Sequence, residues 1–330
     1  MSSRKLFAGL AALAVGVGAF LWTREKPISS EKNKSDSQAT WTRAKRFAGP
    51  MEHPRGIATD QDAVFVVTGG FEKADNAVLK IDAKSGHIEV LARQPHVLSG
   101  ELSLSVQHVY FSTTAAGAIL RVAKAGGVAE VVTKAPAPTH LSVDETAVYF
   151  AAQHEGHSAL FRAPLSGGPT ERLVSGQPVM SDLVLDQTHV YFRSNSGLWK
   201  VDKKTGAASC LLPTEPQRNV GRLAIDDQYL FFLLETDKRG KYAVSRIAKQ
   251  GGKPETIGPV ANLTGRLALS DTHVYFFREV DLTTDALAKV PKTGGSPELV
   301  DGAGYSTGYL AISGGDAYFA DSKHLYRVPK

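Results

Sequence analysis

Short runs in which apolar and polar residues alternate follow one another along most of the chain, and this period of two is typical of β-strands. Seven of these runs place an aromatic residue five positions after a small polar or acidic residue, here called the marker. The markers are Asp60, Ser105, Asp144, Asp186, Asp226, Ser270 and Ser313. The aromatic residues are Phe65, Tyr110, Tyr149, Tyr191, Phe231, Tyr275 and Tyr318. Successive markers lie 39 to 45 residues apart, which is the length of a four-stranded propeller blade, so the pattern predicts an all-β, seven-bladed β-propeller.

The third repeat shows how four strands fit into one period. Alternation predicts an innermost strand at 141–143, a second strand at 147–151 and a third at 160–163. The tight turn Ser166-Gly167-Gly168, in which glycine can take a positive φ, then leads to an outer strand at 171–174. Because a glycine-bearing turn recurs at this point in five other repeats, the period and the turn chemistry predict the same fold.

The third strand of each repeat carries a basic residue, and in the first six repeats an acidic or polar residue follows nine positions later. The pairs are Lys80 and Glu89, Arg121 and Glu130, Arg162 and Glu171, Lys200 and Ser209, Arg246 and Glu255, and Lys289 and Glu298. In a hairpin closed by the glycine turn these residues face one another, where opposite charges contribute a few tenths to about 1 kcal/mol. A basic stripe for nucleic acid would need unpaired charges, so we predict no nucleic-acid partner.

The seventh repeat reaches Lys330 after only three strands, and an open sheet edge promotes aggregation. Phe47 stands 13 residues before the first marker, as Leu173 stands before the fourth. We therefore expect an N-terminal strand to complete the last blade and close the ring. In this register Lys45 would face Arg327, a pair of like charges.

The N-terminal segment resembles an address signal. Arg4 and Lys5 precede an uncharged, mostly apolar stretch at 6–22, as in a signal peptide or a signal anchor. Its 17 residues would span about 26 Å as a helix, slightly less than a hydrocarbon core of about 30 Å. Small residues at Val17-Gly18-Ala19 have cleavage spacing, but the apolar run continues beyond them, which favours an uncleaved anchor. We predict a membrane-tethered protein in the periplasm or at the cell surface, and a secreted one if the segment is cleaved.

Three regions follow from these patterns: a signal anchor or signal peptide at 1–26, a disordered tether at 27–40, and the propeller at 41–330. The net charge of +5 is too small to name a partner. The single cysteine, Cys210, excludes an intramolecular disulfide, and its apolar neighbours predict a small buried residue. We expect a monomer.

Two stretches carry a family resemblance. The runs LSVDETAVYF at 141–150 and LFRAPLSGG at 160–168 resemble repeats of bacterial exported β-propellers related to the NHL and YWTD groups. The resemblance covers 41–330, although most repeats lack the YWTD signature and YWTD rings usually have six blades. Propellers related to these groups include receptor ectodomains, scaffold modules, RNA binders, lactonases and lyases, so the resemblance implies a fold but not a function.

A candidate site lies where each innermost strand begins, because these positions ring the mouth of the channel on one face of a propeller. The residues at this position are Gly56, Glu101, His140, Asp182, Arg222, Arg266 and Tyr309. Arg222 and Arg266 would form a fork for a carboxylate or phosphate, with the two acidic residues opposite. In the alternative interpretation these side chains only pair with one another and contact solvent.

A weaker hypothesis concerns metal. His154 and His157 belong to one predicted loop, and His140 belongs to the same repeat. Three such ligands with an open position would suit zinc. A loop lacks the fixed geometry of a helical HExxH motif, so solvated histidines are the favoured interpretation and no cofactor is predicted, with zinc or calcium as the alternative.

The sequence contains no glycine-rich phosphate loop, GxSxG elbow or HExxH motif. Our first functional hypothesis is a non-catalytic binding or scaffold module outside the cytoplasm, which presents its loop face to a protein, peptide or cell-wall component. The alternative is a metal-dependent propeller enzyme of lactonase or lyase type that uses Glu101, Asp182 and the histidines.

Overall fold

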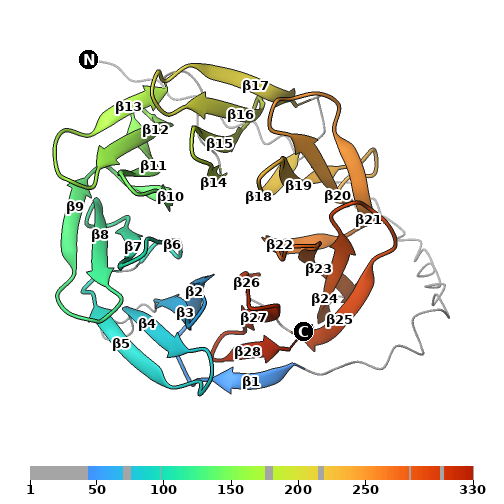
Figure 1. Cartoon of the computed structure of the whole chain (residues 1–330), viewed down its shortest axis with the longest axis horizontal. Coiled ribbons are helices and arrows are strands. Elements are labelled where there is room, and N and C mark those ends of the chain that lie inside the picture. Colours follow the sequence, from blue (N-terminus) through green and yellow to red (C-terminus); the bar gives the residue numbers. More distant parts are fainter. Residues whose placement is uncertain are drawn as a thin grey trace, which may run out of the picture. The chain divides into compact units, whose positions relative to one another are not determined.

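The computed structural model describes residues 44–69, 76–96, 98–174, 181–214, 219–281, 284–304 and 308–329. These residues form seven antiparallel sheets of four strands each, arranged as blades around a central axis (Figure 1). The segments predicted at 1–26 and 27–40 lie outside the described residues. Among the described residues, none belongs to a helix long and apolar enough to span a membrane.

Each blade runs from an inner to an outer strand in chain order. Blade 1 contains β2 (Pro54–Thr59), β3 (Ala63–Thr68), β4 (Ala77–Asp82) and β5 (Ile88–Arg93). Blade 2 contains β6 (Leu102–Leu104), β7 (His108–Thr113), β8 (Ala118–Ala123) and β9 (Glu130–Lys134). Blade 3 contains β10 (Thr139–Val143), β11 (Ala147–His154), β12 (His157–Pro164) and β13 (Glu171–Val174). Blade 4 contains β14 (Ser181–Leu185), β15 (His189–Ser194), β16 (Gly197–Asp202) and β17 (Ala208–Pro213).

The remaining blades repeat this order, except that the last one takes its outer strand from the start of the propeller. Blade 5 contains β18 (Val220–Ile225), β19 (Tyr229–Glu235), β20 (Tyr242–Ala248) and β21 (Glu255–Ala261). Blade 6 contains β22 (Leu263–Leu269), β23 (His273–Asp281), β24 (Thr284–Pro291) and β25 (Glu298–Gly304). Blade 7 contains β26 (Leu310–Ser313), β27 (Asp316–Ala320), β28 (Leu325–Val328) and β1 (Lys45–Ala48). The prediction of seven blades closed by an N-terminal strand is confirmed.

The core is divided among the junctions between blades. All seven repeat aromatic residues are buried, and each of the seven hydrophobic clusters combines side chains from two neighbouring blades. At the junction of blades 3 and 4, for example, Tyr149 packs in one cluster with Phe192 and Val201. Burying each such large side chain stabilises the fold by about 1.5–3 kcal/mol.

The acidic markers join neighbouring blades. In Asp144, Oδ1 accepts hydrogen bonds from the N–H groups of Thr146 and Ala147 and so shapes the turn into the second strand. The other carboxylate oxygen contacts a lysine of the next blade, and we call this ion pair a fastener. The four fasteners among the described residues are Asp60–Lys124 at 2.8 Å, Asp144–Lys203 at 2.7 Å, Asp186–Lys249 at 3.1 Å and Asp226–Lys292 at 3.0 Å.

Two of the three repeats with a serine marker also lack the matching lysine. Opposite Ser105 of blade 2, the lysine position of blade 3 is occupied by Leu165. Opposite Ser313 of blade 7, the lysine position of blade 1 is occupied by Ala83. The counterpart of Ser270 is Lys330, which lies outside the described residues. At these two described junctions, acid and base are therefore replaced together, as expected if each is retained for its partner.

The predicted cross-strand pairs are also confirmed. The registers are Lys80↔Glu89, Arg121↔Glu130, Arg162↔Glu171, Lys200↔Ser209, Arg246↔Glu255 and Lys289↔Glu298. Three of the pairs form ion pairs, at 3.0 Å for Arg121, 2.7 Å for Arg246 and 3.3 Å for Lys289. The basic residues Lys80 and Arg162 instead donate to carbonyl groups of the next blade.

The closing strand adopts the register with like charges. Lys45 faces Arg327 across β1 and β28. The charge of Arg327 is balanced by Asp316, whose Oδ2 accepts from Nε at 2.7 Å, and Arg327 Nη1 also donates to the carbonyl of Ala83 in blade 1 at 3.2 Å. The register is therefore tolerated because Arg327 has a carboxylate partner within its own blade.

One prediction about burial was wrong. Cys210 is exposed on β17, although its apolar neighbours predicted a buried residue. The strand is the outermost one of blade 4, and its first three residues, which alternate between the two faces of the sheet, are exposed.

Candidate functional site

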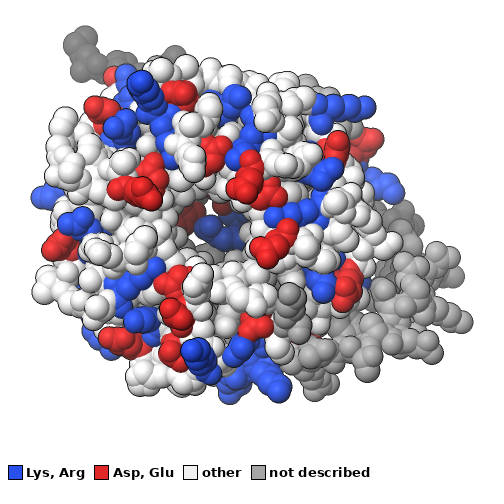
Figure 2. Space-filling model, viewed as in Figure 1, with Lys and Arg blue, Asp and Glu red and all other residues white. Residues whose placement is uncertain are grey.

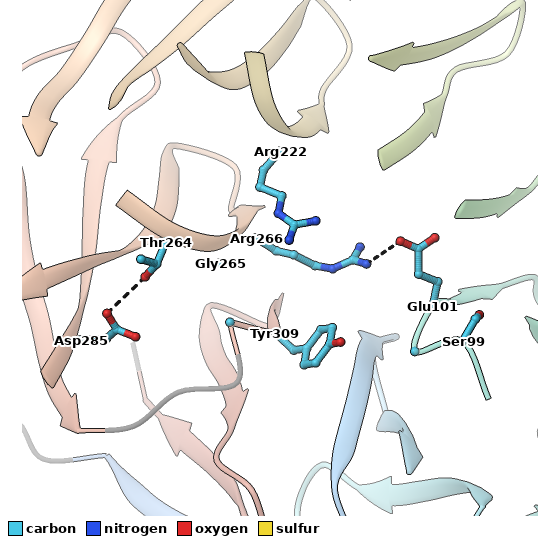
Figure 3. A pocket seen from close by; sticks show the side chains of 10 residues that line it. Ser99, Glu101, Arg222, Thr264, Gly265, Arg266, Asp285 and Tyr309 are labelled. Atoms are coloured by element: carbon cyan, nitrogen blue, oxygen red, sulfur yellow. Dashed lines mark hydrogen bonds and ion pairs between the residues drawn. The ribbon is translucent and has the colours of Figure 1, made fainter. Parts of the chain in front are cut away.

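A partly buried carboxylate links three blades at the mouth of the channel. Glu101 Oε1 lies 2.8 Å from Nδ1 of His140 and 2.9 Å from Nη2 of Arg266, so it connects blades 2, 3 and 6. Figure 3 shows its contact with Arg266. Burial alone would raise the pKa of Glu101, but the hydrogen bonds and charges of His140 and Arg266 outweigh it and hold the pKa below its ordinary value. The group is therefore a carboxylate at neutral pH.

Arg266 is held in place by the close approach of blades 6 and 7. Gly265 has a φ of +70°, and a Cβ there would lie 2.8 Å from the carbonyl oxygen of Gly308, so only glycine fits this position. The N–H of Arg266 donates to the same carbonyl at 2.8 Å. Its guanidinium carbon lies 5.8 Å from the centre of the Tyr309 ring, a cation–π distance.

A second ion pair joins blades 4 and 5. Arg222 Nη1 contacts Asp182 Oδ1 at 3.5 Å, and Asp182 is only 5 % exposed. The backbone of Asp182 has a φ of 35°, and His140, at the equivalent position of blade 3, has a φ of 47°. Such left-handed residues are uncommon outside glycine and cluster where a site fixes the backbone.

Two adjoining cavities open at this mouth and share Arg222 and Gly265. The smaller cavity, of about 340 Å³, contains Glu101, Arg266 and Tyr309 together with Thr264 and Asp285, whose side chains are 3.2 Å apart (Figure 3). The larger, of about 580 Å³, is lined by His140, Arg193, Asn219 and Tyr242 and by the apolar side chains of Val220, Leu233 and Leu263. Figure 2 shows basic atoms inside the central opening, with acidic atoms around it.

Arg193 is a site residue outside the predicted ligand-binding positions, which are all at the beginnings of innermost strands. It lies at the end of β15, two positions after the repeat aromatic Tyr191. The corresponding residues of the other blades are uncharged and buried: Val67, Ser112, Ala151, Leu233, Phe277 and Ala320. Comparing this position across the repeats would have identified Arg193. Burial and the neighbouring Arg222 lower the pKa of Arg193, while Asp182 and Tyr242 oppose this effect.

The histidines do not assemble as the metal hypothesis required. β11 and β12 are longer than predicted, and His154 pairs with His157 across a two-residue turn formed by Glu155 and Gly156. The predicted loop is therefore wrong, because Gly156, with a φ of 79°, lets both strands continue to the turn. His140 instead contacts Glu101. Within the described ranges, no three His, Cys, Asp or Glu side chains are placed to hold a metal ion.

Six predicted residues make up what we call the channel mouth: Glu101, His140, Asp182, Arg222, Arg266 and Tyr309. All but Asp182 line one or both cavities, and Asp182 contacts Arg222. Of the two arginines predicted as a fork, Arg266 is bound to Glu101 and Arg222 contacts Asp182. The structure instead pairs Arg222 with Arg193 on the larger cavity.

No family model matches the sequence, and no curated protein sequence is significantly similar to it. Solved structures are similar in fold. A streptogramin B lyase superposes with a TM-score of 0.66 at 15 % identity, covering 86 % of this chain and 96 % of the lyase. The chain is a β-propeller like its structural neighbours.

Two further neighbours of this propeller differ from each other in function. A puromycin-hydrolyzing peptidase of Mycobacterium tuberculosis gives a TM-score of 0.63 at 15 % identity, over 82 % of this chain and 48 % of the peptidase. YCF48 bound to a D1 peptide gives 0.58 at 12 % identity, over 87 % of this chain and 96 % of YCF48. Identities this low show the fold alone.

Proposed function

We propose that the protein is a non-catalytic binding module outside the cytoplasm, which holds a protein, peptide or cell-wall component at the channel mouth. The observation that carries this proposal is the convergence of charged side chains from blades 2 to 6 on two adjoining cavities. A rigid ring with side chains supplied by many blades is a preorganised surface, which lowers the entropic cost of binding.

The state of Glu101 favours binding over acid–base chemistry. A general base works best with a pKa near the working pH, whereas Arg266 and His140 hold the pKa of Glu101 below its ordinary value. Its proton affinity is therefore low, and its carboxylate orients the neighbouring side chains. A protein of this fold that binds a peptide, YCF48, is a precedent for the class of partner.

The proposed location rests on the N-terminal segment, with Arg4 and Lys5 before the apolar stretch at 6–22. We expect the full chain in the membrane fraction, facing away from the cytoplasm, and a soluble propeller after truncation at Lys26. Fractionation with protease accessibility measures this. Recovery of the full chain in the cytosol would contradict it.

Photo-crosslinking in cells tests the binding proposal. Replacing Tyr309 with benzoylphenylalanine places the crosslinker at the channel mouth. Replacing Val106, which is 89 % exposed, places it outside the mouth and serves as the control. We expect a discrete crosslinked product at Tyr309 only. The paired substitution Glu101→Gln with Arg266→Met, which removes both charges of one ion pair, should abolish the product. A product at Val106 alone, or one at Tyr309 that survives the paired substitution, would overturn the proposal.

A further inference from the structure

The larger cavity owes its character to a single departure from the repeat. At the position two residues after the repeat aromatic, blade 4 has Arg193, while the other six blades bury an uncharged side chain. Placing a guanidinium where the fold accepts an alanine or a valine costs desolvation. Because the other six blades fold without a charge at this place, we interpret Arg193 as a binding residue.

The lining of this cavity combines positive charge with an apolar wall. Arg193 and Arg222 both line it, and none of the described lining residues is acidic. The nearby carboxylate of Glu235 is engaged within its own blade, since Oε2 accepts from both nitrogens of Asn219 and Oε1 accepts from the N–H of Gly240 at 2.9 Å. The cavity therefore favours an anionic group.

Part of the cavity wall is apolar. Val220, Leu233 and Leu263 line the same cavity and are at most 6 % exposed in the structure, so they are fixed parts of the core. A volume of about 580 Å³ falls in the range of about 300–1,000 Å³ that small-ligand pockets occupy. A ligand that fills it contacts both cationic groups and hydrocarbon.

The two arginines place like charges on the same cavity. Burial and the charge of Arg222 lower the pKa of Arg193. Asp182 favours the charge of Arg193, but the same carboxylate is also the partner of Arg222. An anion between the two guanidiniums would relieve this repulsion and accept hydrogen bonds from both.

We propose that the larger cavity binds the carboxylate group of a ligand with an apolar body. The carboxylate lies between Arg193 and Arg222, and the body lies on Val220, Leu233 and Leu263. This assignment rests on the proposed binding function and names the chemistry that the channel mouth recognises. A small carboxylic acid and the C-terminal end of an apolar peptide share this chemistry.

Isothermal titration calorimetry on the full chain in lipid nanodiscs tests the assignment with four probes. These are octanoate, octanamide, acetyl-glycyl-glycyl-leucine and the amide of that peptide. We expect acids to bind and amides to bind at least tenfold more weakly, because an amide has no negative charge for the two guanidiniums to pair with. Binding of the peptide acid alone would assign the group to a peptide end, and binding of both acids would assign it to carboxylates in general.

Variants connect the binding to the two arginines. Arg193→Met and Arg222→Met keep the side-chain length, and we expect each to weaken acid binding by about tenfold or more. Arg172→Met is the matched control, since Arg172 is an exposed arginine on the outer strand β13. Arg222 has a side chain that is 43 % exposed, so its variant should fold even if Arg193→Met does not.

Two results would overturn the assignment: equal affinity for acid and amide, or acid binding unchanged in both variants. The outcome is separable from that of the proposed function. If crosslinking at Tyr309 persists while no acid binds, the carboxylate assignment is wrong and the binding module stands. If acids bind through both arginines while Tyr309 gives no product, the partner proposal is wrong and the carboxylate site stands.

Discussion

Removing one fastener lysine tests whether the Asp–Lys pairs hold neighbouring blades together. Lys203 donates to Asp144 Oδ2 at 2.7 Å and to the carbonyl of Asp186 at 2.5 Å, and its ammonium lies 5.0 Å from the centre of the Tyr149 ring. We expect Lys203→Met to lower the free energy of unfolding by about 1–3 kcal/mol, the range for hydrogen bonds to charged groups that lose a partner.

The pKa of Asp144 gives a magnitude for Lys203 and the turn together. Burial would raise this pKa, but Lys203 and the groups of the turn lower it from 3.8 to about 2. At about 1.36 kcal/mol per pKa unit this corresponds to about 2.4 kcal/mol, which solvent screening of a carboxyl in contact with water reduces to about 1 kcal/mol. Because the folded pKa is lowered, this contribution is present above the unfolded pKa of 3.8 and is lost as the pH falls through about 2.

Denaturant unfolding of a double-mutant cycle measures the pair itself. Asp144→Asn removes the charge but keeps an oxygen that can accept from the turn, and Lys204→Met is the control on the exposed neighbouring lysine. We expect a coupling of about 1 kcal/mol at pH 7, which shrinks between pH 4 and pH 2. A coupling near zero, or equal effects of the Lys203 and Lys204 variants, would refute the account.

Three further predictions follow from the same structure. Ser105→Asp together with Leu165→Lys should install the absent fastener, so the double variant should exceed the sum of the single variants by about 0.5–1 kcal/mol in denaturant unfolding; additive effects would contradict this. Deleting 41–49, which contains β1, should expose the edge of β28 and cause aggregation in light scattering, and an unchanged monomer would show that closure is dispensable. EDTA should leave the melting temperature unchanged, because Glu101 is already bound by Arg266 and His140. A metal at 100 times its dissociation constant would add about 2.7 kcal/mol to the free energy of unfolding. A clear drop in the melting temperature with EDTA would therefore favour the metal-dependent enzyme.

The fold could be predicted because the same short-range sequence features recur from repeat to repeat. The marker shapes a turn, the aromatic residue five positions later enters a core cluster, and basic and acidic residues nine apart fix a hairpin register. The like-charged pair of Lys45 and Arg327 could also be predicted, but the ion pair of Arg327 with Asp316 could not. The local sequence pattern predicts which residue faces Arg327 on the neighbouring strand, but it does not determine the rotamer that directs the Arg327 side chain to Asp316.

The site could be predicted as a set of positions but not as a set of contacts. Glu101 and Arg266 are 165 residues apart, and no local spacing relates side chains that meet across a ring. Arg193 lies outside the strand starts and is detected only as an exception to the repeat. Polar residues at the histidine turn predict a loop, although the two strands continue and pair up to His154 and His157.

The closing strand also determines how the ring would respond to mechanical load. β1 has three register pairs with β28 and an irregularity between Arg46 and Ala48, and the N–H of Ala44 just before it contacts Asp301 of blade 6. Tension on the preceding segment, where the membrane tether is predicted, would first load this contact and then peel the strand one pair at a time. The joint that makes the ring circular is thus also the place where a pulling force would open it, while the strands of the other six blades remain in their sheets.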